Sequence, residues 1–403
     1  MSRRRPQAGS RLPLVRPVAI AIGIAVLAVL AGCGAASEGD PELTIYLSAP
    51  LSGPRSLDGR DVADGATLAL EDAGGEAAGT RVTLEVLDDA DDGGWDAALS
   101  GANARAATED STTIAYLGEL DSGASRTSIP ITNQAGILQV SPGAAAEDLT
   151  REAIGSDAVP TAIQPSGART FGRVIPSDRA QGEAAGSWMS DEGIASVMIL
   201  GEKESFGAAI ASGLAAAPSA PAIVATAQSP EALLFAGELP VGDSDGLLLP
   251  KGAALFGTDA LLADPALLKG FEGIAAGKLG GSCRPADGCE PPRLTSAAVD
   301  PAQLPPEAAA FLDDFEAAYD RPPGRLAAYG YEAMAATLDS IERAEDPLDR
   351  KAVVDAFFAT ADRPSILGTY SIDEVGNTTL SRLGAYEVRG GRAVPEPEPI
   401  AAG

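Results

Sequence analysis

The chain from Leu43 onward alternates short apolar stretches with amphipathic ones, a pattern typical of strands separated by helices. Two early stretches alternate apolar and polar residues, and three later ones are evenly apolar, as in strands buried on both faces. These five predicted strands are Leu43–Leu47, Val82–Leu87, Ile114–Leu117, Ile137–Val140 and Ile194–Leu200. Helices are expected between them over Asp61–Asp72, Asp96–Ala107 and Ser122–Gln134. Strands separated by helices of this length predict parallel sheets with right-handed crossovers, and so an α/β fold.

Further apolar residues at helical spacing mark later helices, and we interpret these stripes as core. They are Phe206, Ile210 and Leu214, then Met334, Leu338 and Ile341, followed by a helix over Pro347–Thr360. A mature chain of about 370 residues is too long for one core and predicts two lobes.

Proline-rich stretches punctuate this pattern. Pro160–Pro165 and Pro291–Pro306 are candidates for the places where the chain crosses between lobes. The tail from Val388, with Pro395 and Pro397, is expected to be disordered.

At the N-terminus a basic segment precedes an apolar one. Arginines are frequent up to Arg16, no acidic residue occurs before Glu38, and Val18–Leu30 is an unbroken apolar or glycine run. Its length of about thirteen residues is that of a signal-peptide core, whereas spanning a bilayer needs roughly twenty.

The apolar run ends in Leu30-Ala31-Gly32-Cys33, which matches the bacterial lipobox. The motif predicts that residues 1–32 are a lipoprotein signal peptide and that Cys33 carries acyl chains such as palmitate, with 33–41 as a tether. Two or more chains hold a protein stably on a membrane, at ~0.8 kcal/mol per buried CH₂. We therefore expect an exported protein anchored at the extracytoplasmic face of the cell membrane. The alternative is an ordinary secretory signal in which Cys33 is incidental.

The net charge argues against nucleic acid as a partner. The sequence has 29 basic and 57 acidic residues, and the leader holds five of the basic residues and none of the acidic ones, so the mature chain is near −33. Such a surface repels phosphate backbones. We interpret the acidity as a contribution to solubility.

Histidine is absent, which excludes histidine-based acid–base catalysis, Ser-His triads and most zinc sites. No metal or cofactor is expected. The absence of histidine does not exclude hydrolysis that uses only carboxylate side chains. The cysteines Cys283 and Cys289 flank a short loop and are most simply a disulfide in an oxidising exterior; a two-thiol metal site and a redox pair are the alternatives.

Two predicted strand ends carry candidate binding chemistry, because ligands of open parallel sheets bind beyond the carboxyl ends of the strands. The first is followed by Asp121-Ser122-Gly123 at a helix start, where a hydroxyl and unpaired N–H groups suit a carboxylate. The alternative is that Ser122 only caps its helix. The second strand end leads into Ser141–Ala145, a loop that exposes backbone donors.

In their order and spacing, eight segments resemble the type I periplasmic binding proteins for branched-chain amino acids and related ligands. They are APLSGP (49–54), GATLALEDAGG (65–75), GELDSGAS (118–125), AGILQVSP (135–142), TFGRVIPSDRAQG (170–182), FG (206–207), AYGYEA (328–333) and GTYSID (368–373). The resemblance implies two Rossmann-like lobes with parallel sheets, joined by a three-segment hinge, which close around a ligand. Lobe 1 would hold 42–166 and 293–365, lobe 2 would hold 167–292 and 366–390, and 391–403 would be a disordered tail.

The resemblance also assigns ligand-binding positions. The carboxylate-binding serine falls on Ser122, preceded by Leu120 and Asp121, and the second carboxylate loop falls on Gly143, Ala144 and Ala145. Ala145 stands where amino-acid binders usually have threonine, so a hydroxyl donor is missing. The acid that holds the ligand ammonium falls on Asp259, with a turn aspartate as the alternative, and Phe206 matches an aromatic wall that could equally be core.

Other walls depart from the family pattern. Positions that are usually aromatic fall on Asp58, Glu238 and Leu326. Two added carboxylates and fewer rings suit a more polar or cationic ligand than leucine. They also suit a degenerate pocket that binds nothing.

The acidic run Asp88–Asp92 lacks the spacing and terminal glutamate of an EF-hand, and we interpret it as a loop with capping duty.

The resemblance predicts a monomeric solute-binding lipoprotein of an ATP-driven (ABC) importer, whose ligand is an amino acid or similar small polar solute. Its permease and ATPase subunits would be separate chains, and it would not be an enzyme. Three alternatives stay open. They are a sensory lipoprotein, a surface protein with a vestigial cleft, and a carboxylate-dependent hydrolase using Asp58, Glu238 and Asp259.

Overall fold

A computed structural model describes residues 42–153, 156, 160–201, 205–224, 230–237, 253–262, 265–275 and 291–402. The signal peptide, Cys33, the tether, Glu238 and the pair Cys283 and Cys289 lie outside the described residues, so the predictions made for them stay predictions. None of the helices in the described part of the chain is long and apolar enough to cross a membrane.

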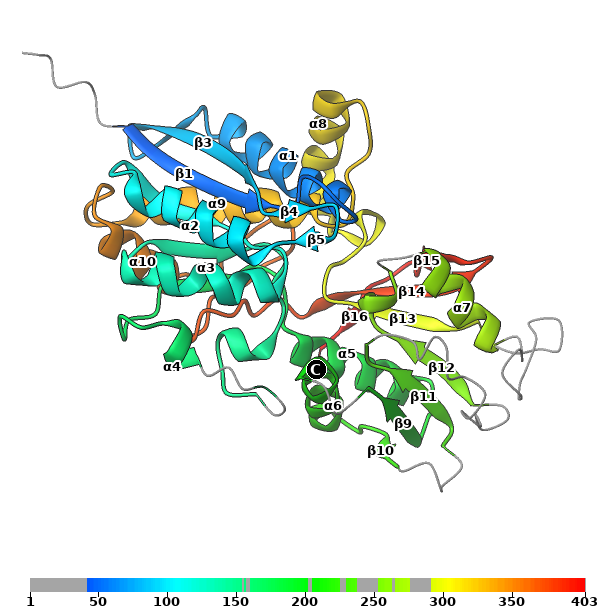
Figure 1. The fold of residues 1–403 in the computed structure, drawn as a ribbon. Helices are drawn as coiled ribbons and strands as arrows, with labels where there is room; N and C mark the ends of the chain where they lie inside the picture. Colours follow the sequence, from blue (N-terminus) through cyan, green and yellow to red (C-terminus); the bar gives the residue numbers. More distant parts are fainter. Residues whose placement is uncertain are drawn as a thin grey trace, which may run out of the picture. The chain divides into compact units, whose positions relative to one another are not determined.

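The first half of the chain builds a six-stranded sheet in the order β2-β3-β1-β6-β7-β8 (Figure 1). All neighbours pair in parallel except β2 with β3. The strands span Glu76–Ala77 (β2), Thr80–Asp88 (β3), Glu42–Ala49 (β1), Thr113–Leu117 (β6), Leu138–Ser141 (β7) and Phe171–Arg173 (β8).

Helices pack on both faces of this first sheet. On one face, apolar residues of four helices join the largest core. These helices are α1 (Ser56–Asp72), α8 (Ala309–Tyr319), α9 (Ala327–Arg343) and α10 (Arg350–Phe358). The other face is covered by α2 (Ala97–Glu109) and α3 (Ser122–Gln134). A short helix α4 (Pro160–Ile163) and a small hairpin of β4 (Ala90–Asp91) and β5 (Gly94–Trp95) complete this half.

The second sheet has the order β10-β9-β11-β12-β13-β14-β15, with β16 also paired to β14. The strands up to β13 pair in parallel, and the C-terminal ones are antiparallel. They span Ala222–Ile223 (β10), Ser196–Leu200 (β9), Ala232–Phe235 (β11), Ala254–Gly257 (β12), Arg293–Ser296 (β13), Arg382–Arg389 (β14), Arg392–Pro395 (β15) and Ile400–Ala401 (β16).

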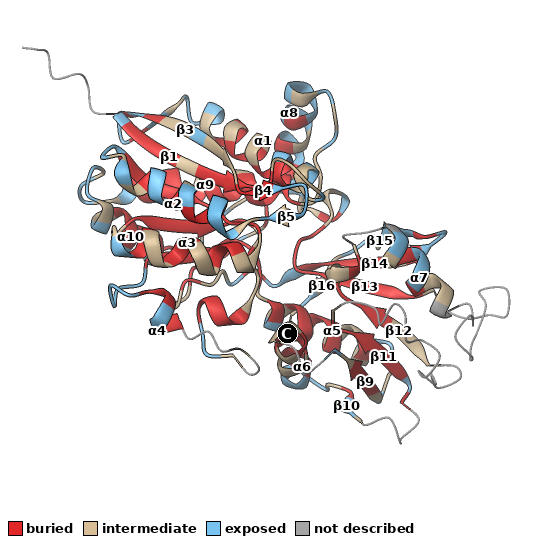
Figure 2. Cartoon of the chain, viewed as in Figure 1, coloured by how far each residue is buried: buried red, intermediate tan, exposed pale blue. Residues whose placement is uncertain are grey.

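Successive residues of the central strands of this sheet enter opposite cores, as the two-residue period of a strand requires. Val197 and Ile199 pack against α5 (Asp178–Asp191) and α6 (Ser205–Ala216), whereas Met198 packs toward α7 (Pro265–Ala275). Figure 2 shows the resulting pattern of buried strands under partly exposed helices. Single 3-10 turns lie at Glu147–Leu149, Asp259–Leu261, Pro301–Gln303 and Pro306–Ala308.

The α/β class with parallel-rich sheets is confirmed, and each strand and helix expected from the apolar pattern is present. The boundaries between the two sheets differ from the expected ones. Phe171–Arg173 pairs with β7, so the first sheet continues beyond residue 166. Strand β13 belongs to the second sheet, so the return crossing follows Ser296 and not residue 293. Side chains from Leu367 to Leu380 pack in the first core, which places the last crossing just before β14.

The C-terminal residues expected to be disordered form strands. Arg389 pairs with Arg392 across Gly390 and Gly391, whose φ angles of 61° and 70° are those of a type I′ hairpin turn. Pro395 ends the edge strand β15 and Pro397 follows it. At the edge of a sheet, the N–H that proline lacks is not needed for hydrogen bonding between strands.

Two glycines let α1 and α9 approach closely, since a Cβ on Gly65 would lie 2.1 Å from the Ala327 carbonyl oxygen and one on Gly330 would lie 2.2 Å from that of Val62. We predict that Gly65→Ala destabilises the protein by about 1–3 kcal/mol, as overpacking does. Gly101→Ala, in the interior of α2, is the matched control, because its new Cβ would meet nothing closer than 3.4 Å. It should stabilise by up to ~1 kcal/mol. Urea unfolding of both variants checks the difference, and equal effects would contradict this account of the packing.

Candidate functional site

The loop after β6 leads into α3 and brings Ser122 to the first position of that helix. The Ser122 hydroxyl does not cap α3; instead it accepts a hydrogen bond of 3.1 Å from the backbone N–H of Ala146. The N-cap residue Asp121 also makes no side-chain cap bond, and its carboxylate binds Arg55 at 2.7 Å. The hydroxyl hydrogen of Ser122 thus stays available as a donor at this strand end.

The loop after β7 is fastened to the loop after β6 by Ser141. Its hydroxyl donates to the carbonyl of Glu119 (2.6 Å) and accepts from the N–H groups of Gly143 (3.2 Å) and Ala144 (2.8 Å). A Cβ on Gly143 would lie 3.0 Å from the Cα of Leu120, so this close approach favours glycine. The backbone donors expected at Gly143 and Ala144 are therefore used inside the protein. Within the described residues, the N–H of Ala145 has no acceptor.

A fully buried arginine organises the rest of this loop. Arg173 donates to the carbonyls of Ala144 (3.1 Å) and Ala146 (2.8 Å), to the hydroxyl of Thr150 (2.9 Å) and to the side chain of Asn377 (2.8 Å). These bonds fix the carbonyls away from the site and leave the opposite, N–H side of the loop facing it.

Two acids face the site from the second sheet. Asp178 begins α5, and no group among the described residues hydrogen-bonds its carboxylate. Burial, followed by the nearby charge of Asp259, raises the pKa of Asp178 to about 8. Asp259 is held in place by Gln181 (3.2 Å) and by the N–H of Ala297 (3.3 Å). A cation at this position would relieve the repulsion between the two acids.

Two arginines stand on the side of the first sheet. Arg55 is bound tightly, by Asp58 at 3.0 and 3.1 Å and by Asp121 at 2.7 Å. The pKa of Arg55 is raised, because the charges of Asp121 and Asp58 outweigh the effect of burial. Among the described residues, Arg325, just before α9, has only long contacts, 3.7 Å to Asp58 and 3.4 Å to the hydroxyl of Ser296.

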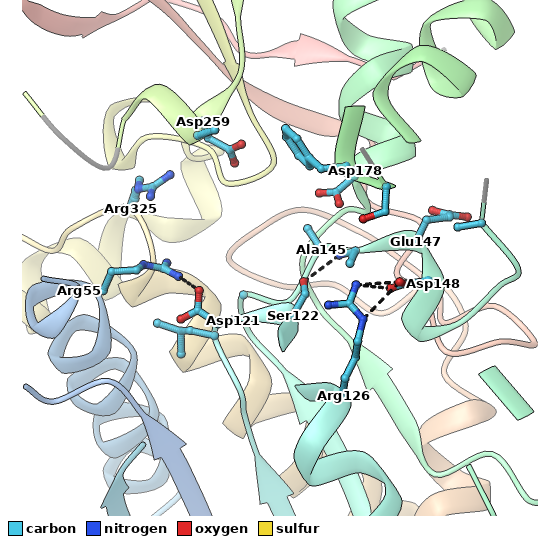
Figure 3. Close-up of a pocket in the computed structure, with 17 residues that line it drawn as sticks. Arg55, Asp121, Ser122, Arg126, Ala145, Glu147, Asp148, Asp178, Asp259 and Arg325 are labelled. Atoms are coloured by element: carbon cyan, nitrogen blue, oxygen red, sulfur yellow. Dashed lines mark hydrogen bonds and ion pairs between the residues drawn. The ribbon is translucent and has the colours of Figure 1, made fainter. Parts of the chain in front are cut away.

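These groups line one cavity of about 460 Å³, shown in Figure 3. Its size suits a small molecule. The lining residues are Arg55, Leu120, Asp121, Ser122, Arg126, Gly143, Ala145, Ala146, Glu147, Asp148, Ala153, Asp178, Ser205, Phe206, Asp259, Ala260 and Arg325. Arg126 is paired with the buried Asp148 at 2.6 Å, so this ion pair forms a neutral part of the wall beside Ser122.

The structure brings together most of the residues predicted for the site. Those that line the cavity are Leu120, Asp121, Ser122, Gly143, Ala145, Phe206 and Asp259. Ala144 does not line it, because its side chain is in a core with Ile129 and Leu149.

Two further predicted positions differ in place. Leu326 is the N-cap residue of α9 and turns into the main core, so its neighbour Arg325 reaches the cavity instead. Asp58 does not line the cavity and instead contacts the two lining arginines, Arg55 at 3.0 Å and Arg325 at 3.7 Å.

Sequence reasoning missed Arg55, Arg126, Asp178 and Arg325. A signal for Asp178 was present, since Ser177-Asp178 is an N-terminal helix signature that follows a strand. Arg325 had no such signal, because a one-residue difference at a helix start decides which side chain faces the cavity.

The acidic run Asp88–Asp92 serves the loop, as interpreted from the sequence. Asp88 accepts from the N–H groups of Leu51 (2.8 Å) and Ala90 (3.1 Å), and Asp91 accepts from that of Gly93 (2.7 Å). Within the described residues, no group of three or more histidine, cysteine or acidic side chains is placed to hold a metal ion.

Asp89 and Glu119 form a buried carboxyl pair directly behind Asp121. Both side chains are fully buried, and Tyr116 donates to Glu119 at 2.6 Å. In the described structure, both oxygens of Asp89 and the Oε2 atom of Glu119 have no hydrogen-bond partner. Burial and the adjoining carboxyl raise the pKa of Glu119 well above its usual range, and burial with nearby acids raises that of Asp89 to about 6. The raised pKa values favour the protonated form of the pair, and a proton held between the two carboxyl groups would supply the hydrogen bond that these oxygens lack.

Two parallel-rich α/β sheets with a polar cavity at their strand ends define the type I periplasmic binding protein fold. Residues 42–229 match the sequence model of the family described as periplasmic binding protein. The resemblance identified from the sequence is thereby confirmed.

Several solved structures share the fold. Leucine-binding protein LivK of Thermotoga maritima has a TM-score of 0.63 at 21% identity, over 89% of this chain and 99% of its own. An ABC transporter substrate-binding protein of Desulfitobacterium hafniense in complex with Leu has a TM-score of 0.66 at 18% identity, over 88% of this chain and 100% of its own. A solute-binding protein of an ABC transporter from R. palustris in complex with benzoate has a TM-score of 0.59 at 20% identity, over 90% of this chain and 98% of its own. No curated protein sequence matches the chain.

The shared proton of Asp89 and Glu119 predicts a pH-dependent stability. Because the folded-state pKa values are raised, this pair contributes most stability at low pH. The contribution is lost as the pH rises from the ordinary carboxyl range through the folded-state pKa, which is about 6 for Asp89. Glu119→Gln keeps a donor for Asp89 and an acceptor for Tyr116 without an ionisable proton. At pH 8 it should raise the free energy of unfolding by on the order of 1–3 kcal/mol, since one pKa unit corresponds to about 1.4 kcal/mol.

Chemical unfolding of wild type and variant between pH 5 and pH 8 measures this gain. Glu109→Gln, at an exposed position, is the control for the change in net charge. A Glu119→Gln protein that is no more stable than wild type at pH 8 would contradict the shared proton.

Proposed function

We propose that this chain is an extracytoplasmic solute-binding protein of an ABC importer and that it captures an amino acid or a similar small polar solute. The observation that carries the proposal is the cavity of about 460 Å³, whose wall brings the Ser122 hydroxyl and the Ala145 N–H close to the carboxyl groups of Asp178 and Asp259. Neither acid forms an ion pair with another described residue. Leucine- and benzoate-bound proteins of the same fold support a small carboxylate-bearing ligand.

The ligand carboxylate is assigned to the Ser122 hydroxyl and the N–H of Ala145. Both lie at the edge where α3 begins, and the positive end of its helix dipole favours an anion there. The ligand ammonium is assigned to Asp178 and Asp259, which face the cavity and form no ion pair with any residue that the structure describes. An ammonium between them would lower their mutual repulsion.

The lipobox at Cys33 and the basic leader support a membrane-anchored protein on the outside of the cell. The permease and the ATPase would be separate chains, and the permease would bind the closed, ligand-bound form of this chain. The chain acts on its solute by binding alone, and we expect it to do so as a monomer.

A binding screen tests the proposal. The purified full-length chain in detergent is heated with amino acids, polyamines, short amides and carboxylates, each at about 100 times its expected dissociation constant. A ligand at that concentration adds ~2.7 kcal/mol to folding, which raises the melting temperature by a few degrees. We predict a saturable shift for at least one α-amino acid, and a loss of affinity of tenfold or more with Ser122→Ala and with Asp259→Ala.

Ser190→Ala and Asp191→Asn are the matched controls, since both positions lie on α5 away from the cavity lining. These two variants should bind as the wild type does. A flat response across the whole panel would overturn the proposal and favour a vestigial cleft.

The raised pKa of Asp178 predicts a pH-dependent affinity. In the empty cavity this carboxyl holds its proton below about pH 8. A ligand ammonium favours the ionised form, so binding releases the proton, and affinity should rise between pH 6 and pH 8 by up to about tenfold per pH unit. Calorimetric titrations at pH 6, 7 and 8 measure the slope. Asp178→Asn should bind more weakly at pH 8 and remove the slope, and a wild-type affinity equal at pH 6 and pH 8 would contradict the assignment.

A further inference from the structure

The part of the cavity where the family resemblance led us to expect aromatic walls holds two guanidinium groups. Arg55 precedes α1 and Arg325 precedes α9, so segments far apart in sequence bring the two arginines to the same wall (Figure 3). Each guanidinium group carries five N–H donors that require acceptors.

The two arginines differ in how their donors are satisfied. Arg55 makes hydrogen bonds of 3.0 and 3.1 Å to Asp58 and one of 2.7 Å to Asp121, so it is part of the wall. Arg325 reaches Asp58 only at 3.7 Å, and the oxygen that it approaches already accepts both bonds from Arg55.

The other contact of Arg325, to the hydroxyl of Ser296, is 3.4 Å long. The side chain of Arg325 is 22% exposed and lines the cavity. Its donors are thus the least satisfied cationic donors of this wall in the described structure.

Building on the proposed function, we propose that the solute carries a second planar oxygen group, a carboxylate or a carboxamide, and that Arg325 binds this group at the far end of the ligand. The guanidinium fork matches such a group with two parallel N–H···O bonds. Arg55 and Asp58 act as positioning residues, since they hold the wall and leave Arg325 as the group that contacts the solute.

Other side-chain chemistries fit this wall less well. A branched aliphatic side chain would remove water from the Arg325 donors without replacing its hydrogen bonds, which destabilises the complex. A cationic side chain offers no acceptor to the Arg325 donors. Charge alone does not separate a carboxylate from a carboxamide, because Arg55 and Arg325 are balanced by Asp58 and Asp121.

The test is a selectivity measurement by isothermal titration calorimetry on the full-length chain in detergent. The probes are aspartate, glutamate, asparagine and glutamine, with leucine, valine and lysine as the comparison set. For the wild type we expect at least one of the first four to bind at least tenfold more tightly than every member of the comparison set. Comparison of glutamate with glutamine, and of aspartate with asparagine, then separates the carboxylate from the carboxamide.

Arg325→Met keeps the length of the side chain and removes its donors. We expect it to lower the affinity ratio of the best acidic or amide solute over leucine by 10- to 100-fold. Arg60→Met, an exposed arginine on α1, is the matched control and should leave the ratio unchanged. Circular dichroism of each variant verifies that it folds.

Each other outcome overturns the inference. Tighter binding of leucine, valine or lysine than of all four acidic and amide solutes would overturn it and leave the proposed function standing. An Arg325→Met variant that weakens every solute equally would show a structural role only, and again the proposed function would stand. No binding by any solute in either set would overturn the proposed function, and this inference with it.

Discussion

The fully buried guanidinium of Arg173 joins the segments that surround the cavity. It is part of β8, and it donates to carbonyl groups on both sides of Ala145, to Thr150 and to Asn377 from the C-terminal part of the chain. The carbonyl of Ala145 itself accepts a hydrogen bond from the N–H of Asp178, so the start of α5 is held by the same loop. A buried arginine without acceptors is very costly, and this full set of partners makes one loop conformation far more stable than its alternatives. The N–H of Ala145 and the carboxylate of Asp178 both depend on that conformation for their place at the cavity.

Much of the architecture could be predicted from the sequence because it rests on local periodicity. Evenly apolar stretches such as Ile114–Leu117 are buried on both faces of a parallel sheet, and this double burial is what removes the alternation of polar residues. The loops after β6 and β7 could also be anticipated, since strand ends in a parallel sheet meet at one edge. Gly143 adds a local reason, because its close contact with Leu120 leaves no room for a side chain.

The parts that could not be predicted depend on pairing between distant segments. Arg325 enters the cavity instead of Leu326 because the leucine fills the core at the first turn of α9, a choice set by packing across the whole sheet. The placement of Asp58 behind Arg55 has the same origin. The ordered C-terminus is a different case: Gly390-Gly391 between alternating residues is a hairpin signal, and the nearby prolines concealed it because they suit an edge strand as well as a disordered tail.

The cavity walls contain charges that folding alone does not require. Asp178 has a raised pKa in the empty cavity, and Arg325 has only distant partners. Apolar residues of similar size at such positions usually give an equally or more stable protein. The two unfavourable environments lie around a single cavity. One holds a carboxyl group whose ionised form a cation would stabilise, and the other holds guanidinium donors with only long contacts among the described residues. A solute with an ammonium group and a carboxylate or carboxamide would relieve both at once. A vestigial cleft gives no reason for this complementarity, whereas a binding site for a small dipolar solute does.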